Sequence, residues 1–150
     1  MDFDNAVVKF WQEFGLCKKM VLSTSQNDIV TSRMMSVVVL DRCFYFQTDT
    51  QSRKYMQLKE NSHASLCIDN IQIEGTCTET GHPAENSSFC ELYEKCFPGS
   101  FKNYTNLLNE RLFRLEPTFI ERWLYIDGKP YMEKIDLSTG EYLLKVYDVE

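Results

Sequence analysis

The chain has 150 residues, of which 43% are hydrophobic and 25% are charged, and it contains only 6 Gly and 4 Pro. This length supplies enough apolar surface for one hydrophobic core, and the composition excludes a disordered or collagen-like protein. The formal charge of −6 makes the average surface repel nucleic acid and anionic membranes. We therefore expect one domain over residues 1–150, with no nucleic-acid or membrane partner.

The cysteines and the N-terminus both bear on the cellular compartment. Six cysteines are scattered without a CxxC pair or the regular spacing of a zinc site or a disulfide framework. They are Cys17, Cys43, Cys67, Cys77, Cys90 and Cys96. We expect all six to be reduced thiols and no metal to be bound. The acidic start MDFDNAVVKF is unlike a signal peptide, and no apolar run approaches about 18 residues, so we expect a cytoplasmic protein.

The first predicted element is an amphipathic helix. Its apolar residues recur at the spacings of four, three and four that place side chains on one helix face. They are Phe3, Val7, Phe10 and Phe14. An acidic residue, Asp2 or Asp4, is typical of the helix start, and Gly15 is typical of its end. We expect this helix to pack against the rest of the protein.

Three segments of β character follow, at residues 18–25, 29–40 and 43–48. The short polar gaps around 26–28 and 40–42 are typical of hairpin turns. These patterns predict three consecutive antiparallel strands.

The middle of the chain alternates short helices and strands. Residues 52–61 predict a helix capped by Ser52, with Tyr55 and Leu58 facing inward and Met56 as a further inward candidate. Strands are expected at 63–69 and 71–79, the second with a bulge or bend at Gly75.

The last third predicts two short helices and then more sheet. Helical spacing covers residues 85–109, with a break at Pro98–Gly99. Residues 111–127 predict one long strand, bulged or exposed at Pro117. Strands at 129–136 and 141–147 complete six to eight antiparallel strands. The fold class is therefore mainly β with peripheral helices, as a closed or split antiparallel barrel.

Polar residues gather where the second and third strands meet the following helix. A hairpin places strand positions side by side, so three cations, two hydroxyls and a helix N-terminus converge. These residues are Arg33, Thr48, Ser52, Arg53 and Lys54. Free N–H groups and cationic side chains favour a phosphomonoester there. The alternative is that Ser52 is only a cap and that Arg53 and Lys54 are solvated surface charges.

Four segments in this order carry a resemblance to a known family. They are SRMMSVV, FYFQTDTQSRKYMQL, ENSHASLCI and IQIEG. Together they resemble the pyridoxamine 5'-phosphate oxidase-like flavoproteins, a superfamily of FMN-binding split barrels, over roughly residues 18–80. The resemblance implies FMN as the cofactor and a homodimer with FMN at the subunit interface.

The resemblance also implies roles for individual residues. The residues expected along the flavin ring are Arg33, Met34, Met35 and Ser36. The residues expected at the phosphate are Thr48, Ser52, Arg53 and Lys54, with Gln47 as their neighbour. Either Asn70 or Gln72 matches a family glutamine that reaches the flavin. Trp123 and Tyr125 are expected over the flavin from the partner subunit, the alternative being ordinary packing.

The C-terminal segment departs from true pyridoxamine 5'-phosphate oxidases. It reads ERWLYIDGKPYMEKIDL and lacks the Arg- and His-rich stretch that grips the substrate phosphate, which disfavours vitamin B6 oxidation. The similar proteins are short members, including nitroimidazole-resistance proteins. They imply an oxidoreductase that passes electrons from a reduced donor to a small planar acceptor, such as a quinone or nitroaromatic.

Two alternatives remain beside this oxidoreductase. One is a module that stores or senses FMN without turnover. The other is a haem-binding relative, which is disfavoured because neither His63 nor His82 has an evident axial-ligand setting. No triad or carboxylate pair suggests hydrolysis.

Overall fold

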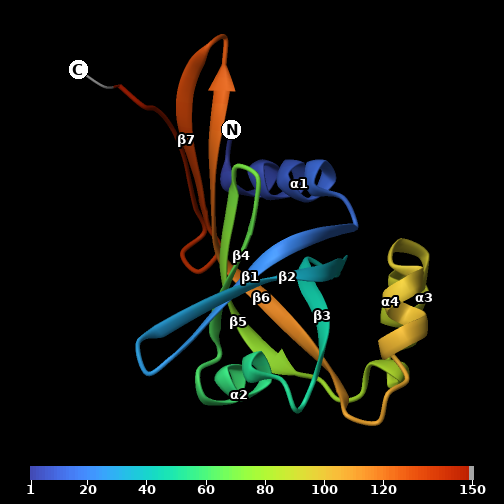
Figure 1. Cartoon of the computed structure of the whole chain (residues 1–150). Coiled ribbons are helices and arrows are strands. Elements are labelled where there is room, and N and C mark those ends of the chain that lie inside the picture. Colours follow the sequence, from blue (N-terminus) through green and yellow to red (C-terminus); the bar gives the residue numbers. More distant parts are fainter. Residues whose placement is uncertain (149–150) are drawn as a thin grey trace.

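The computed structural model describes residues 1–148 and consists mainly of antiparallel β-structure (Figure 1). The strands are β1 (Cys17–Gln26), β2 (Ile29–Leu40), β3 (Cys43–Asp49), β4 (His63–Ile68), β5 (Ile71–Glu79), β6 (Glu110–Ile126), β7 (Lys129–Asp136) and β8 (Glu141–Val146). The helices are α1 (Phe3–Phe14), α2 (Arg53–Glu60), the short 3-10 helix η1 (Pro83–Glu85), α3 (Ser87–Cys96) and α4 (Pro98–Tyr104).

The sheet closes on itself to form the predicted split barrel. The strands are hydrogen-bonded in the order β3-β2-β1-β4-β5-β6-β7-β8, and β3 also pairs with β6. This last pairing closes the first six strands of the order into a barrel and leaves β7 and β8 as an extension beyond β6. Barrel closure removes free sheet edges, which would otherwise expose unpaired backbone groups.

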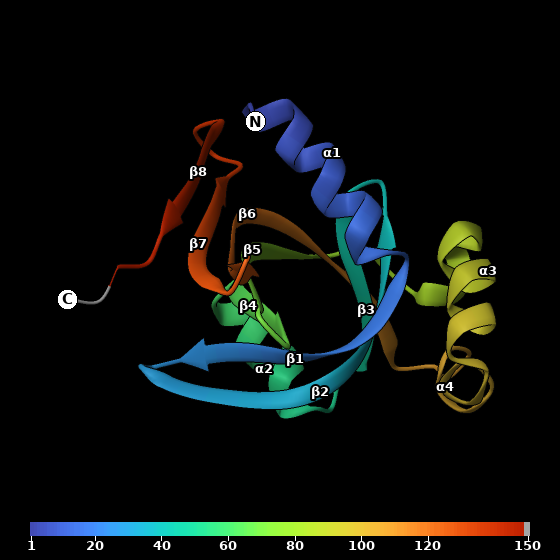
Figure 2. The same ribbon diagram turned by 90° about the horizontal axis from the view of Figure 1, so that it is seen from above.

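The first helix covers one end of the barrel core. The side chain of Asp2 accepts a hydrogen bond from the Asn5 backbone N–H at 2.9 Å, and Gly15 has the positive φ of 87° that ends the helix. Phe10 and Phe14 are buried, and the ring of Phe14 meets that of Phe44 on β3 edge-on at 5.4 Å between centroids. Figure 2 shows α1 running from the side of β8 toward β2 and β3. The predicted helix and its packing are confirmed.

Both predicted hairpins are present. Asn27 and Asp28 have φ of 53° and 65°, and Asp41 and Arg42 have φ of 50° and 59°. Two consecutive residues with positive φ define the tight turn whose twist suits a two-stranded ribbon, and Asn and Asp tolerate this conformation well.

The two predicted irregularities of the sheet turn out to be one. The β5–β6 register shifts between Glu74 and Gly75, and Gly75 lies opposite Pro117. A Cβ atom on Gly75 would sit 2.5 Å from the carbonyl oxygen of Glu116. The glycine therefore permits a close approach of the two backbones, and the bulge accommodates a proline that has no N–H to donate.

Helix α2 confirms most of its predicted inward face. Leu58 is buried, and the ring of Tyr55 meets Phe113 edge-on at 5.8 Å between centroids. The inward assignment of Met56 is wrong: its side chain is exposed, because successive helical residues are about 100° apart and Tyr55 already faces the barrel.

Helices α3 and α4 pack outside the barrel, at the side seen on the right of Figures 1 and 2. Phe89 and Tyr93 on α3 form a second buried cluster with Val38 of β2 and Leu112 of β6. The predicted break falls one residue early, at Phe97, because Pro98 occupies the first turn of α4, where proline needs no hydrogen-bond partner.

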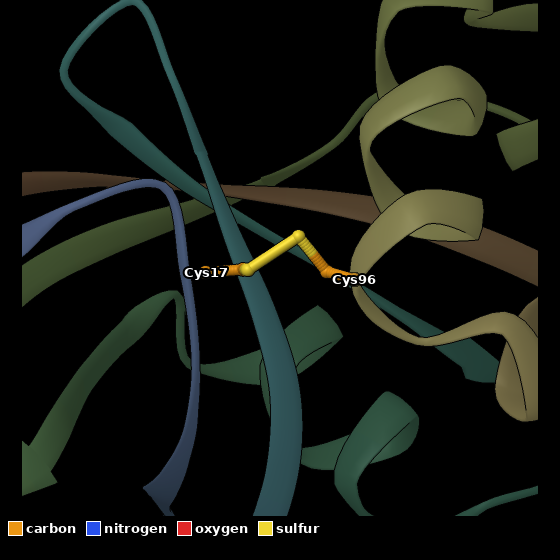
Figure 3. The surroundings of a disulfide bond; sticks show 2 residues. All are labelled: Cys17 and Cys96. Atoms are coloured by element: carbon orange, nitrogen blue, oxygen red, sulfur yellow. A yellow bond between two sulfur atoms is a disulfide. The ribbon is translucent and has the colours of Figure 1, made fainter.

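A disulfide joins this helical layer to the barrel. Cys17 at the start of β1 bonds to Cys96 at the end of α3, with 6.5 Å between their Cα atoms (Figure 3). The expectation that all six cysteines are reduced is therefore wrong for this pair. The partners lie 79 residues apart, so only the tertiary fold brings them together, and local spacing carries no sign of it. The other four cysteines are free thiols.

Within residues 1–148, no helix has the length and apolar character needed to span a membrane.

Candidate functional site

The start of α2 carries a pair of hydroxyls directly after β3. The Ser52 hydroxyl donates to the Asp49 carbonyl oxygen at 2.8 Å and accepts from the Tyr55 backbone N–H at 3.3 Å. The hydroxyl oxygens of Thr48 and Ser52 lie 2.9 Å apart. The structure therefore brings these two predicted site residues together at the N-terminus of the helix.

Three cations converge at the same place. Arg33 on β2 and Lys54 on α2 are half-buried, whereas Arg53 is exposed. Burial lowers the pKa of the Arg33 guanidinium, and the charge of Arg53 lowers it further. Burial likewise lowers the pKa of Lys54, followed by the charge of Arg33. The three positive charges thus destabilise one another, and the residues present fit a phosphate, because a bound anion would relieve this repulsion.

The guanidinium of Arg33 is fixed by neutral oxygen atoms. One terminal nitrogen donates to the Leu22 carbonyl at 3.2 Å and to the Thr24 hydroxyl at 2.8 Å. The other donates to the Thr31 hydroxyl at 2.6 Å and to the Gln57 side-chain oxygen at 3.3 Å. These partners orient the cation without neutralising it.

The oxygen atoms that hold Arg33 were not predicted from the sequence. Thr24 and Gln57 are buried, and the Thr24 hydroxyl donates to the Gln57 side-chain oxygen at 2.6 Å. The sequence signal that could have indicated these partners of Arg33 is that both are polar residues at positions that face the core. Within the described chain, none of the hydrogen bonds of Arg33 reaches Thr48 or Ser52, so Arg33 joins the cluster through its charge rather than through a shared hydroxyl.

The remaining β2 residues divide between two faces. Met35 packs against the barrel core, whereas Met34 is 59% exposed on the outer face. Because successive strand residues point to opposite sides, the two methionines lie on opposite faces of β2, and their place along a flavin ring stays a prediction. Ser36 shares the outer face with Met34. Burial raises the pKa of Tyr93 on α3, against the opposing effects of the Ser100 and Ser36 side chains.

Gln47 lies in the barrel wall rather than at the cation cluster. Its side chain is buried, and its oxygen accepts a hydrogen bond from the Thr105 hydroxyl at 3.0 Å. Gln47 therefore anchors the segment that follows α4. Its predicted place as a neighbour of a phosphate stays a prediction.

The aromatic residues predicted over the flavin lie toward the far end of β6. The ring of Trp123 meets Tyr147 at 5.0 Å between centroids, and Tyr125 is exposed. Trp123 lies twelve residues beyond Arg111, the partner of Thr48 in the ladder, a span of roughly 40 Å along an extended strand. The structure does not bring Trp123 to the cation cluster of its own chain.

The predicted flavin contacts on the β4–β5 hairpin also lie near Trp123. The Asn70 side chain donates to the Trp123 carbonyl oxygen, and the Asn70 backbone carbonyl oxygen accepts from the Trp123 backbone N–H at 3.3 Å. Gln72 is exposed on β5. Asn70 therefore has a structural partner, while Gln72 is free to face solvent.

Of the two histidine side chains, that of His82 has hydrogen-bond partners in the fold and that of His63 has none among the described residues. The Nδ1 atom of His82 accepts from the Ala84 backbone N–H at 3.1 Å, and its Nε2 atom lies 2.7 Å from the Leu107 carbonyl oxygen. Both ring nitrogens are thus used to order the loop. His63 is exposed on β4, and residues 1–148 contain no cluster of metal-ligating side chains.

A buried carboxylate that was not predicted from the sequence lies beside the cations. Glu110 opens β6, is 5% exposed and pairs with Asp49 across the β3–β6 ladder. Burial, followed by the charge of Asp49, raises the pKa of Glu110 to about 7, against the opposing effects of Lys54 and His82. Its signal in the sequence was a charged residue at the start of a long strand.

Comparison with solved structures identifies the fold. A pyridoxamine 5'-phosphate oxidase-related, FMN-binding protein from Nostoc punctiforme is 16% identical, with a TM-score of 0.64 over 87% of this chain and 88% of that one. PhzG from Burkholderia lata, solved with tetrahydrophenazine-1-carboxylic acid, is 16% identical, with a TM-score of 0.64 over 99% and 94%. General Stress Protein 26 from Bacillus anthracis is 22% identical, with a TM-score of 0.60 over 95% and 98%.

A search of curated proteins finds no match to the sequence. The family model for pyridoxamine 5'-phosphate oxidase, in contrast, matches residues 3–124, which include the barrel, the cation cluster and most of the long strand β6. On this match and the split-barrel topology, the chain belongs to the pyridoxamine 5'-phosphate oxidase family.

Proposed function

We propose that this protein binds FMN, with the terminal phosphate at Arg33, Arg53 and Lys54 and the N-terminus of α2. The observation that carries the proposal is the convergence of three cations, two of them half-buried, whose charges destabilise one another. Hydrogen bonds between charged groups and a phosphate are stronger than neutral ones, and a helix N-terminus adds unpaired N–H groups. A dianionic phosphomonoester matches this arrangement.

The chain's own residues suggest where the flavin ring would lie. Arg33 shares the inner face of β2 with Met35, whereas Met34 and Ser36 face outward, so within one chain a ligand anchored at Arg33 lies on the Met35 side of the strand. Met35 offers apolar contact on that side. Bound FMN would supply electron-transfer chemistry, which the protein orients.

The acceptor is proposed to be a small, planar, uncharged molecule such as a quinone or a nitroaromatic, with a reduced nicotinamide as the donor. Arg122 supports this, because it donates to Glu133 at 2.6 Å and to Glu13 at 3.0 Å. Its charge is neutralised inside the protein and is not offered to a substrate phosphate. The other C-terminal cations within the described residues are the separate lysines Lys129, Lys134 and Lys145, which form no compact grip.

A homodimer is proposed to complete the site. Several exposed apolar side chains lie at the β1–β2 hairpin tip, on β2 and at the β6–β7 end, namely Ile29, Val30, Met34, Tyr125 and Ile126. Burying such side chains between two copies is favourable, and a twofold arrangement is the commonest solution. A second copy would also bring its Trp123 to the flavin, which the distance along β6 prevents within one chain.

The absorption spectrum and flavin kinetics test this function together. The protein is expected to purify yellow, with one FMN per subunit. It is also expected to sediment as a dimer. In stopped flow, the reduced flavin is expected to reoxidise with quinones or nitroaromatics faster than pyridoxamine 5'-phosphate reduces the resting protein. FMN that binds without turnover with any acceptor would indicate storage or sensing instead, and a haem Soret band would contradict the flavin assignment.

A further inference from the structure

Glu110 lies beside the cation cluster, but it forms no ion pair with these cations within the described residues. Lys54 lowers the pKa of Glu110, and Glu110 raises that of Lys54, so the two charges act on each other. The ion pairs within 4.0 Å in residues 1–148 nevertheless join other residues: Lys9–Glu13, Lys59–Glu79, Arg122–Glu13 and Arg122–Glu133. Lys54 therefore remains available to an external anion.

The surroundings of Glu110 disfavour its ionised form on balance. The groups that act on its carboxyl are Asp49 from β3, Lys54 from α2 and His82 ahead of η1, and the charge of Glu110 in turn adds to the effect of the burial that raises the pKa of Tyr93 on α3. Asp49 lies directly opposite in the ladder, where facing Cβ atoms are about 5 Å apart. On β6 itself, the Arg111 guanidinium bonds to the main-chain oxygens of Glu110 and Leu108, and not to the carboxylate.

We propose that Glu110 is an internal anion that sets the affinity of the cation cluster for a phosphomonoester. When protonated, it leaves the charge of Lys54 to the ligand. When ionised, its carboxylate competes with the phosphate for Lys54, and its negative charge repels the phosphate. This inference rests on the proposed function, because it assumes that FMN phosphate binds at these cations.

The direction of the pH effect follows from charge. A phosphate dianion beside Glu110 stabilises the protonated carboxyl further, so the complex takes up a proton when it forms near or above pH 7. Affinity for FMN must then fall as pH rises. The second ionisation of the FMN phosphate, with a pKa of about 6, acts in the opposite direction. The two effects are separable because only one of them involves Glu110.

The test is a fluorescence titration of apoprotein with FMN at several values between about pH 6 and pH 8, at constant ionic strength. Wild-type affinity is expected to weaken about tenfold per pH unit at most above neutrality, the limit for one linked proton. In Glu110→Gln, affinity is expected to stay level or to rise slightly with pH, and to exceed that of the wild type at the alkaline end. Identical pH profiles for the two proteins would overturn the inference.

Two further variants provide an independent test and a control. Asp49→Asn removes the facing negative charge while keeping an oxygen for the Gln51 N–H, so the loss of affinity is expected to begin at a lower pH. If Glu110→Gln does not fold, an unshifted profile in Asp49→Asn overturns the inference by itself. Glu79→Gln is the matched control, because Glu79 pairs with Lys59 at 3.6 Å instead, and it should keep the wild-type profile.

The outcomes for the proposed function are distinct from these. Wild-type protein that binds no FMN at any pH overturns the proposed function, and this inference falls with it. FMN binding with the same pH profile in wild type and Glu110→Gln overturns the inference alone.

Discussion

Two arginines in this barrel have opposite electrostatic environments. Arg122 is 8% exposed and bonds to two carboxylates, Glu133 at 2.6 Å and Glu13 at 3.0 Å. Arg33 is half-buried and bonds only to hydroxyl, amide and carbonyl oxygens, and its pKa is lowered by burial and then by the charge of Arg53. The first charge is neutralised within the fold. The second is oriented but uncompensated, which is the condition expected of a residue that meets an external anion.

The Arg122 network also explains how the extension of the sheet is held to the barrel. Glu133 on β7 accepts from Arg122 of β6 and, at 2.8 Å, from the Tyr142 hydroxyl of β8, while Glu13 reaches the same arginine from α1. Burial and the Glu133 hydrogen bond raise the pKa of Tyr142, so the phenol keeps its proton. Four elements are therefore joined through one guanidinium.

The largest expected effect is the loss of stability when the Arg122 ion pairs are removed. Arg122→Met leaves the Glu133 carboxylate buried and unpaired, and a loss of about 3 to 5 kcal/mol in the free energy of unfolding is expected. Denaturant unfolding measures it. The matched variant Arg33→Met is expected to cost less stability, because it also relieves repulsion with Arg53 and Lys54. Equal losses in the two variants would remove the distinction between a structural and a ligand-binding arginine.

The second expected effect is a loss of FMN affinity when a cation of the Arg33 cluster is removed. Arg33→Met and Lys54→Met are each expected to weaken FMN binding by about 1.5 to 3 kcal/mol, the scale of a hydrogen bond to a charged group. Arg42→Met, in the β2–β3 turn, is the control and should leave affinity nearly unchanged. Calorimetric titration of each folded apoprotein makes the measurement. A similar loss in all three variants would mean general electrostatic attraction rather than a defined site.

The smallest expected effect concerns Glu110 and the stability of the apoprotein. Its pKa is raised from 4.5 to about 7 in the folded state, so its contribution is fully present below pH 4.5 and is lost as pH rises through about 7. Glu110→Gln is therefore expected to gain stability relative to wild type at about pH 8, on the order of 1 kcal/mol, but not at about pH 5. Thermal unfolding at the two pH values checks this. An advantage of equal size at both would assign the gain to packing instead.

Local sequence signals predicted the fold well because they act over a few residues. The caps Asp2 and Ser52 and the turn at Asn27–Asp28 each depend on neighbouring backbone groups. The Cys17–Cys96 disulfide escaped prediction because its partners lie in different layers.

The candidate site divides in the same way. Ser52, Arg53 and Lys54 are contiguous and could be placed together from the sequence. Gln57 and Glu110 could not, since one reaches the site as the partner of Arg33 and the other through the β3–β6 closure of the barrel. The separation of Met34 from Met35 follows from strand alternation, which the family resemblance by itself does not express.

The central claim is that the uncompensated cations around Arg33 hold a phosphate, and comparing FMN with riboflavin tests it most directly. The two ligands share the same ring and ribityl chain and differ only in the terminal phosphate. Titration of the wild-type apoprotein is expected to show FMN binding at least about tenfold more tightly than riboflavin, the equivalent of one charge-assisted hydrogen bond or more. In Lys54→Met this ratio should shrink while riboflavin affinity stays the same. Equal affinity of the wild-type protein for the two ligands would contradict the account.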